Sequence, residues 1–345
     1  MIKIKLLEHH IHRNETTFRP FVFAQNYLRD IGIEFTDSGD YDYAWVGQAS
    51  IIDKKKSLKE SVDKGLEFIS EITGDYMIVD GQDSTSLIGT IDVFRESNAT
   101  LFLKNSYLKD FDLYKKGWAN GRIYWGEGNY LVPDIDNLKS KMKLTGCNWL
   151  HTIQPQWLDY NQDKKYDISC MFGYPTSNPV YEHDLCQTDY YDKHRKELLE
   201  TLMCESCEGD KYKIAGLVNG ERIPKQEYYD KMYNSKIIMA PIGYGAMAPR
   251  DIEAAMFGSI LVKPDMNFID SKPFIYEDNE TYIAVNYDWS NLEERLDYVL
   301  SNYNELREYL VKNIRKKYAE EYEYSKIALH LYDIFNQLNE ITSEN

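Results

Sequence analysis

The segment SKIIMAPIGYGAMAPRDIEAAMFGSILVKP, residues 235–264, constrains the fold of this chain more than any other stretch. The hydrophobic run SKIIMAP predicts a β-strand, and a loop that contains glycines follows it. Pro249 stands where a helix can begin, because the first turn of a helix tolerates proline. Gly258 ends this helix and precedes a second strand-like run, SILVKP. A strand, a helix and a second strand in this order form the repeating unit of a parallel α/β sheet.

Arg250 and Glu253 are the side chains of this unit that suit ligand binding. They are three residues apart, so they share one face of the helix and can point toward the loop. The first N–H groups of a helix are unpaired and lie at the positive end of its dipole, which suits a phosphate. Arg250 can add a two-pronged contact to a diphosphate, and Glu253 can accept two hydrogen bonds from a ribose diol. The pattern favours a nucleotide-sugar, although a simple surface ion pair has the same spacing.

The same segment resembles the donor-binding segment of GT-B glycosyltransferases, and it is most similar to the exostosin-type and spore-maturation-type families. The residues that carry the resemblance are Ser235, Lys236, Pro241, Gly243, Gly245, Arg250, Glu253, Ala254 and Gly258. In such families the arginine contacts the diphosphate of the donor, and the glutamate contacts its ribose. The resemblance implies these roles for Arg250 and Glu253, and it places Gly243 and Gly245 in the donor-binding loop.

A looser match covers KKYDISCMFGYPTSNP, residues 164–179, together with the helix-like DKHRKELLETL after it. It resembles the opening of the GT-B C-terminal domain, where a strand ends in a Phe-Gly turn near the phosphates, and this implies that Gly173 and Thr176 lie there. Tyr244, between the loop glycines, could stack on the base, and Lys263 could stabilise the leaving diphosphate. The alternatives are a plain polar turn for Thr176, an exposed loop residue for Tyr244 and a solvated strand end for Lys263.

The base that deprotonates the acceptor has two candidate sources in the N-terminal half. Asp80 and Asp83 in VDGQDS follow a predicted strand, where α/β sheets place ligand groups, although Asp-Gly pairs also favour turns. His10 and His12 in HHIHR follow the first predicted strand, and they share one side if the segment stays extended. A neutral imidazole is a suitable base near neutral pH. Since the histidines lack an identifiable third ligand, we predict no metal.

Composition argues against several other classes of protein. The formal net charge of −16 disfavours nucleic acid as a partner. The sequence has no run of about 18 apolar residues, so we expect no transmembrane segment, and the start MIKIKLLEHH predicts a strand and not a secretion signal. Five cysteines, an odd number, argue for a reducing compartment and a cytoplasmic protein. Cys204 and Cys207 lack the further ligands that a zinc site needs, and three Asp-x-Asp triplets are attributed to chance in an acidic chain.

Strands and helices alternate along both halves of the chain, which predicts an α/β fold with two Rossmann-like domains facing across a cleft. We expect an N-terminal acceptor-side domain over residues 1–150, a polar linker over residues 151–165 and a nucleotide-sugar-binding domain over residues 166–316. Residues 317–345 are expected to form a helix that, as in GT-B enzymes, crosses back onto the N-terminal domain.

These expectations describe a glycosyltransferase of glycan biosynthesis, a hexosyl- or pentosyltransferase that is metal-independent and inverting. It would move a sugar from a UDP- or GDP-sugar to a glycan or glycosylated acceptor, with no cofactor beyond the donor. Two alternatives stay open. One is an inactive GT-B-like binding or scaffold module, and the other is a sugar-nucleotide epimerase or phosphorylase of the same layout.

Overall fold

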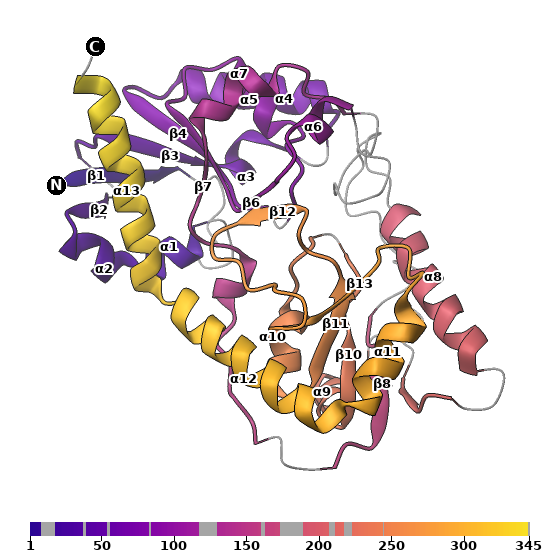
Figure 1. The fold of residues 1–345 in the computed structure, drawn as a ribbon. Helices are drawn as coiled ribbons and strands as arrows, with labels where there is room; N and C mark the ends of the chain where they lie inside the picture. The colour runs from indigo at the N-terminus through magenta and orange to yellow at the C-terminus, as the bar shows by residue number, and fades with distance from the viewer. Residues whose placement is uncertain are drawn as a thin grey trace.

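The protein folds into two halves, each built around a parallel β-sheet (Figure 1). The structure is a computed structural model of the chain, and it describes residues 1–7, 18–36, 39–53, 56–82, 84–116, 130–159, 163–172, 189–206, 211–216, 223–243 and 245–343. The first sheet uses strands between residues 2 and 144, and the second uses strands between residues 166 and 285. The α/β architecture predicted from the alternation of strands and helices is confirmed.

The first sheet has its strands in the order β2-β1-β3-β4-β5-β7, and all neighbouring pairs are parallel. Its strands are β1 (Ile2–Leu7), β2 (Ile33–Thr36), β3 (Tyr43–Gly47), β4 (Asp75–Asp80), β5 (Leu101–Lys104) and β7 (Met142–Leu144). The helices of this half are α1 (Arg19–Phe23), α2 (Gln25–Asp30), α3 (Gln48–Ile51), α4 (Leu58–Ser70), α5 (Thr90–Arg95), α6 (Asp112–Lys116) and α7 (Ile135–Leu138), with 3-10 turns η1 (Lys139–Lys141) and η2 (Trp149–Thr152).

Both faces of this sheet are covered, so its inner strands β3, β4 and β5 are buried along most of their length. Successive side chains of a strand point to opposite faces, and β3 shows this directly. Ala44 and Val46 pack in the cluster that includes residues of α4 and α5. Trp45 packs in the other cluster, against α1 and α2. The sheet therefore needs helices on both sides.

The second sheet has the order β13-β11-β10-β8-β9, and its neighbouring strands are also parallel. Its strands are β8 (Tyr166–Ser169), β9 (Ile214–Ala215), β10 (Ser235–Met239), β11 (Ile260–Pro264) and β13 (Ile283–Val285). The helices of the C-terminal half are α8 (Asp189–Ser206), α9 (Lys225–Tyr233), α10 (Pro249–Met256), α11 (Leu292–Ser301), α12 (Tyr303–Glu321) and α13 (Tyr324–Ser343). Strand β10 lies between β8 and β11, which places the loop after it near the middle of the sheet.

The last helix returns to the first half, as predicted. Figure 1 shows α12 and α13 running one after the other along one side of both halves. Ile327, Leu331, Ile334 and Phe335 of α13 recur at helical spacing, and they are buried in the hydrophobic cluster of the first sheet that also contains Trp45. This packing joins the C-terminal end of the chain to the N-terminal core.

A two-stranded antiparallel sheet also joins the halves. It pairs β6 (Ser106–Leu108), from the N-terminal half, with β12 (Ile269–Ser271), from the C-terminal half. Strand β5 ends at Lys104, and the chain leaves the first sheet at Asn105. The Asn105 side chain donates to the Gly81 carbonyl and accepts from Thr145 Oγ1, so this residue turns the chain out of the ladder.

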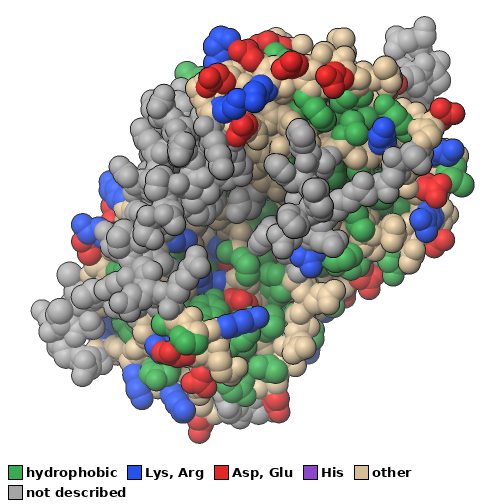
Figure 2. All heavy atoms as spheres, turned by 180° about the vertical axis from the view of Figure 1, so that it is seen from behind, with side chains coloured by type: hydrophobic (Ala, Val, Ile, Leu, Met, Phe, Trp, Pro, Cys, Tyr) green, Lys and Arg blue, Asp and Glu red, His purple; other side chains and the backbone are tan. Residues whose placement is uncertain are grey.

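The surface of the described residues carries both signs of charge. Figure 2 shows the face seen from behind, where Asp and Glu side chains are interspersed with Lys and Arg along the outer edges. Within the described ranges, no helix combines the length and the apolar character that crossing a membrane requires.

Asp80 and Lys104 form an ion pair inside the first sheet. They end the neighbouring strands β4 and β5, their charged atoms are 3.1 Å apart, and neither side chain has exposed surface. Asp80 Oδ2 also accepts a hydrogen bond from Thr90 Oγ1, and Oδ1 accepts one from the Gln82 backbone N–H. A buried pair of this kind is held by its own hydrogen bonds, and removing one partner leaves an uncompensated charge.

We therefore predict that Lys104→Met lowers the free energy of unfolding by about 3–5 kcal/mol, because Asp80 would stay buried without its cation. Asp80→Asn combined with Lys104→Met should lose less than Lys104→Met alone, since the double variant buries no unpaired charge. Urea unfolding of the parent and the variants measures both values. A double variant that loses the sum of the two single losses would contradict this account.

Candidate functional site

The loop between β10 and α10 is the centre of the candidate site. Strand β10 ends at Met239, residue Ala248 is extended, and α10 begins at Pro249. The Asp251 side chain closes the first turn of α10 by accepting a hydrogen bond from the Ala248 N–H at 3.0 Å. Gly258 ends the helix with φ of 64°, a left-handed conformation that favours glycine. The helix predicted at this position is confirmed.

Beneath this loop lies a buried polar network centred on Asp251. Lys263 Nζ donates to Asp251 Oδ2 at 2.6 Å and to the Ala246 carbonyl at 2.8 Å. Tyr276 donates to the same carboxylate oxygen at 2.6 Å. Burial lowers the pKa of Lys263 while Asp251 acts in the opposite direction, and burial raises the pKa of the Tyr276 phenol. The network ties the loop and the first turn of α10 to strand β11.

The prediction that Lys263 contacts a diphosphate needs correcting on this geometry. Its side chain is 1% exposed, and its ammonium group is already bonded inside the protein. In this conformation the group has no open path to a ligand, so we assign Lys263 to the support of the loop.

Arg250 links α10 to the end of β8. Its Nη2 atom donates to the Met171 carbonyl at 2.8 Å. Its Nε atom is buried and finds no acceptor among the described residues. The guanidinium group is therefore positioned at the carboxyl end of β8, an interior strand of the second sheet, where parallel α/β sheets place their ligands.

Glu253 lies one turn further along α10 and is half-buried. Its Oε2 atom accepts a hydrogen bond from the Tyr228 hydroxyl of α9 at 2.7 Å. Burial raises the pKa of Glu253, whereas the Tyr228 bond and the charge of Arg250 act in the opposite direction. Tyr228 was not identified from the sequence, because nothing in the pattern of α9 indicates that this residue reaches α10.

Gly243 has a neighbour that sequence reasoning also missed. A Cβ atom on Gly243 would lie 2.6 Å from Nη2 of Arg195, a residue of α8. The same guanidinium group lies over the ring of Phe172, with its Cζ 5.9 Å from the ring centroid. The helix-like run DKHRKELLETL was the available signal, but it offered several cations without indicating which one reaches the loop. Gly245 is buried in the same loop, and its carbonyl accepts from the Gly243 N–H.

Several predicted site residues lie outside the described residues. They are His10, His12, Asp83, Gly173, Thr176 and Tyr244. Their assigned roles stay predictions. Asp80 is described, but its carboxylate is buried in the ion pair with Lys104 and has no exposed surface. A base must reach the acceptor hydroxyl, so this burial argues against Asp80 as that base, and we assign it to the sheet.

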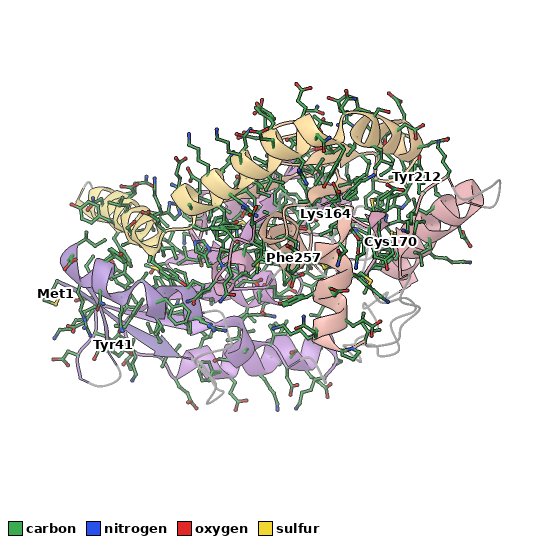
Figure 3. The ribbon with its side chains drawn as sticks, turned by 90° about the horizontal axis from the view of Figure 1, so that it is seen from below. Met1, Tyr41, Lys164, Cys170, Tyr212 and Phe257 are labelled. Carbon is green, nitrogen blue, oxygen red and sulfur yellow. The ribbon has the colours of Figure 1, made fainter. Side chains whose placement is uncertain are left out.

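The opposite end of α10 is capped by a lysine and an arginine. Burial, with the charges of Arg307 and Arg315, lowers the pKa of Lys164 to about 7. Lys164 Nζ donates to the Phe257 carbonyl at 2.7 Å, and the two residues lie close together in Figure 3. Arg315 donates to the carbonyls of Ala255 and Met256. Cations at a helix C-terminus complement its dipole. The positive end of α10 is thus the end that carries Arg250 and faces the loop.

Within the described part of the chain, no three His, Cys, Asp or Glu side chains are grouped as the ligands of a metal ion would be.

Comparison with known proteins identifies the fold. No protein-family model and no curated protein matches the chain. Sucrose-phosphate synthase from Thermosynechococcus elongatus aligns with 99% of this chain and 100% of its own, with a TM-score of 0.52 and 14% identity. The UDP-GlcNAc 2-epimerase of Neisseria meningitidis bound to UDP-GlcNAc has a TM-score of 0.49 and 12% identity, over 98% of this chain and 100% of its own. Anabaena HepE in complex with UDP and glucose has a TM-score of 0.45 and 8% identity, over the same shares.

The likeness to sucrose-phosphate synthase shows that the chain has the GT-B fold, with two Rossmann-like domains and a returning C-terminal helix. At 14% identity it shows the fold alone. The resemblance to the exostosin-type and spore-maturation-type families is not confirmed, and it stays a prediction.

The raised pKa of Glu253 gives a testable pH dependence. Between the ordinary glutamate pKa of 4.5 and the raised pKa of native Glu253, the native state keeps a proton that the unfolded chain has released. The free energy of unfolding should therefore fall as pH rises across this interval. Urea unfolding from about pH 4.5 to about pH 7 measures this change in the free energy of unfolding. The contribution of Glu253 is the difference between the parent and Glu253→Gln at each pH.

Tyr228→Phe is the matched variant, since it removes only the hydroxyl that favours ionised Glu253. It should raise the pKa of native Glu253 further, because the carboxylate loses a hydrogen-bond donor, and so extend this interval to higher pH. Parallel stability curves for the parent and Glu253→Gln would show that Glu253 titrates alike in both states.

Proposed function

We propose that the protein is a glycosyltransferase that moves a sugar from a UDP- or GDP-sugar to a glycan or glycosylated acceptor. The observation that carries this proposal is the pairing of Arg250 and Glu253 at the positive end of α10. Both side chains are held in place, Arg250 by the Met171 carbonyl and Glu253 by the Tyr228 hydroxyl. The GT-B fold supports the same class of reaction, as an analogy at the level of the fold.

The diphosphate of the donor would bind at the start of α10. Pro249 has no N–H, and the N–H groups of Ala248 and Asp251 are bonded within the first turn. The guanidinium group of Arg250 would therefore provide the donors for the diphosphate oxygens, at the positive end of the α10 dipole. The donors are fixed before the ligand arrives, so they lose little freedom on binding.

Glu253 would bind the ribose of the nucleoside. Tyr228 occupies Oε2, which leaves Oε1 to accept a hydrogen bond from a ribose hydroxyl. Burial makes an unpartnered carboxylate costly, and a hydroxyl donor offsets part of that cost. The spacing of one helical turn between Arg250 and Glu253 then matches a ligand with a pyrophosphate on one side and a pentose on the other.

In the transfer step, an acceptor hydroxyl attacks the anomeric carbon while the bond from that carbon to the diphosphate oxygen breaks. The base takes the acceptor proton, and negative charge develops on the leaving diphosphate. Arg250 and the helix N-terminus stabilise that charge without a metal. His10, His12 and Asp83 are the proposed sources of the base, and direct displacement would invert the anomeric centre.

We predict that Arg250→Ala weakens binding of the nucleoside diphosphate by about 10- to 100-fold, since it removes a charge-assisted hydrogen bond. Isothermal titration calorimetry with UDP, GDP and their sugars measures this. Arg29→Ala is the matched control, because Arg29 is an exposed arginine of the N-terminal half, 3.8 Å from Glu34. It should bind the same ligands as tightly as the parent.

Two outcomes contradict the proposal. Equal affinity of Arg250→Ala and the parent would remove Arg250 from the site. A parent that binds the donor but transfers no sugar to any acceptor, across a broad panel, would point to a binding or scaffold module. Release of nucleoside diphosphate that depends on an acceptor supports transfer.

A further inference from the structure

Two arginines from different helices converge on the end of strand β8. Arg250, from α10, donates to the carbonyl of Met171. Arg195, from α8, lies over the ring of the next residue, Phe172. The proposed function uses only the first of these cations, so the position of the second calls for its own explanation.

Arg195 also lies against the loop that precedes α10. Its Nη2 atom is 2.6 Å from the point that a Cβ on Gly243 would occupy, and its Cζ is 3.7 Å from that point. Gly243 does not adopt the left-handed backbone region in which glycine is preferred. Glycine here leaves the space that the guanidinium group occupies, and a Cβ at this position would displace the end of the Arg195 side chain.

The charges around this position favour an anion. The start of α10 is a positive dipole end, Arg250 is on its first turn, and Arg195 adds a second guanidinium group at the same strand end. The two nearest carboxylates of α10 have partners already: Asp251 is bonded to Lys263 and Tyr276, and Glu253 to Tyr228. One guanidinium group and a helix N-terminus suit a single phosphate, whereas two guanidinium groups suit two.

We infer that Arg195 is a second phosphate-binding residue, which makes the site prefer nucleoside diphosphates to monophosphates. The inference rests on the proposed function. In it, Arg250 and the helix N-terminus bind one phosphate of the donor, and Arg195 binds the other. Gly243 keeps the space open in which the guanidinium group of Arg195 reaches its ligand.

The first test compares UDP with UMP, and GDP with GMP, by calorimetry. Arg195→Gln should weaken diphosphate binding by about 10- to 100-fold and monophosphate binding by less than about threefold, because only the second phosphate loses its partner. Lys196→Gln is the matched control on the same helix. Lys196 is exposed and lies 3.3 Å from Glu200, and its removal should leave both affinities unchanged.

The second test uses Gly243→Ala in a double-mutant cycle with Arg195→Gln. The added methyl group should displace the end of the flexible Arg195 side chain with little loss of thermal stability, and it should lower the preference for diphosphates. In the Arg195→Gln background the same change should have little further effect, because the displaced group is already absent.

The outcomes separate the two proposals. A parent that binds no nucleoside diphosphate overturns the proposed function and this inference with it. A parent that binds diphosphates, with the same ratio of diphosphate to monophosphate affinity in Arg195→Gln, overturns the role of Arg195 alone. Equal loss of both affinities in Arg195→Gln also overturns it, since that result indicates a packing role against Phe172.

Discussion

The candidate site depends on one carboxylate oxygen. Oδ2 of Asp251 accepts hydrogen bonds from the Ala248 N–H, from Lys263 and from Tyr276. These donors belong to the loop, to strand β11 and to the chain beyond it. A short helix such as α10 has little stability of its own in water, so its first turn is oriented by what holds it. Because Asp251 and Arg250 are neighbours in that turn, the buried network also decides where the guanidinium group of Arg250 points.

The positions of the main strands and helices could be predicted from the sequence, and the positions of several site residues could not. Hydrophobic runs and helical spacing identified β10, α10 and β11 correctly because burial of a regular face is a local property of the sequence. Arg195 and Tyr228 reach the site from α8 and α9, and such a contact depends on how helices far apart in the sequence pack together. No local sequence pattern predicts such a contact. Arg250 and Glu253 could be identified because both lie on one helix.

The pairing of β6 with β12 connects the two halves of the molecule. Strand β5 ends at Lys104, and β6 begins two residues later. Strand β11 ends at Pro264, and β12 follows after a short turn. Since β6 and β12 pair with each other, the carboxyl ends of β5 and β11 are brought near one another. Asn148 strengthens this junction by donating to the Pro273 carbonyl and to the Tyr322 hydroxyl. The junction therefore turns the carboxyl ends of these two strands toward each other.

The two buried ion pairs explain why charged residues at strand ends were predicted to contact substrate. Asp80 and Lys263 both stand at the ends of strands, where ligand groups are common, and both were predicted to act on substrate. Each is instead bonded to an opposite charge, Asp80 to Lys104 and Lys263 to Asp251. A charge at this depth is tolerated only when it is paired and hydrogen-bonded, so these groups are committed to the fold. Arg250 and Glu253, in contrast, lie on helix α10, and neither forms a buried ion pair of this kind. Arg250 is fixed by its bond to the Met171 carbonyl, and Glu253 is fixed by the Tyr228 hydroxyl.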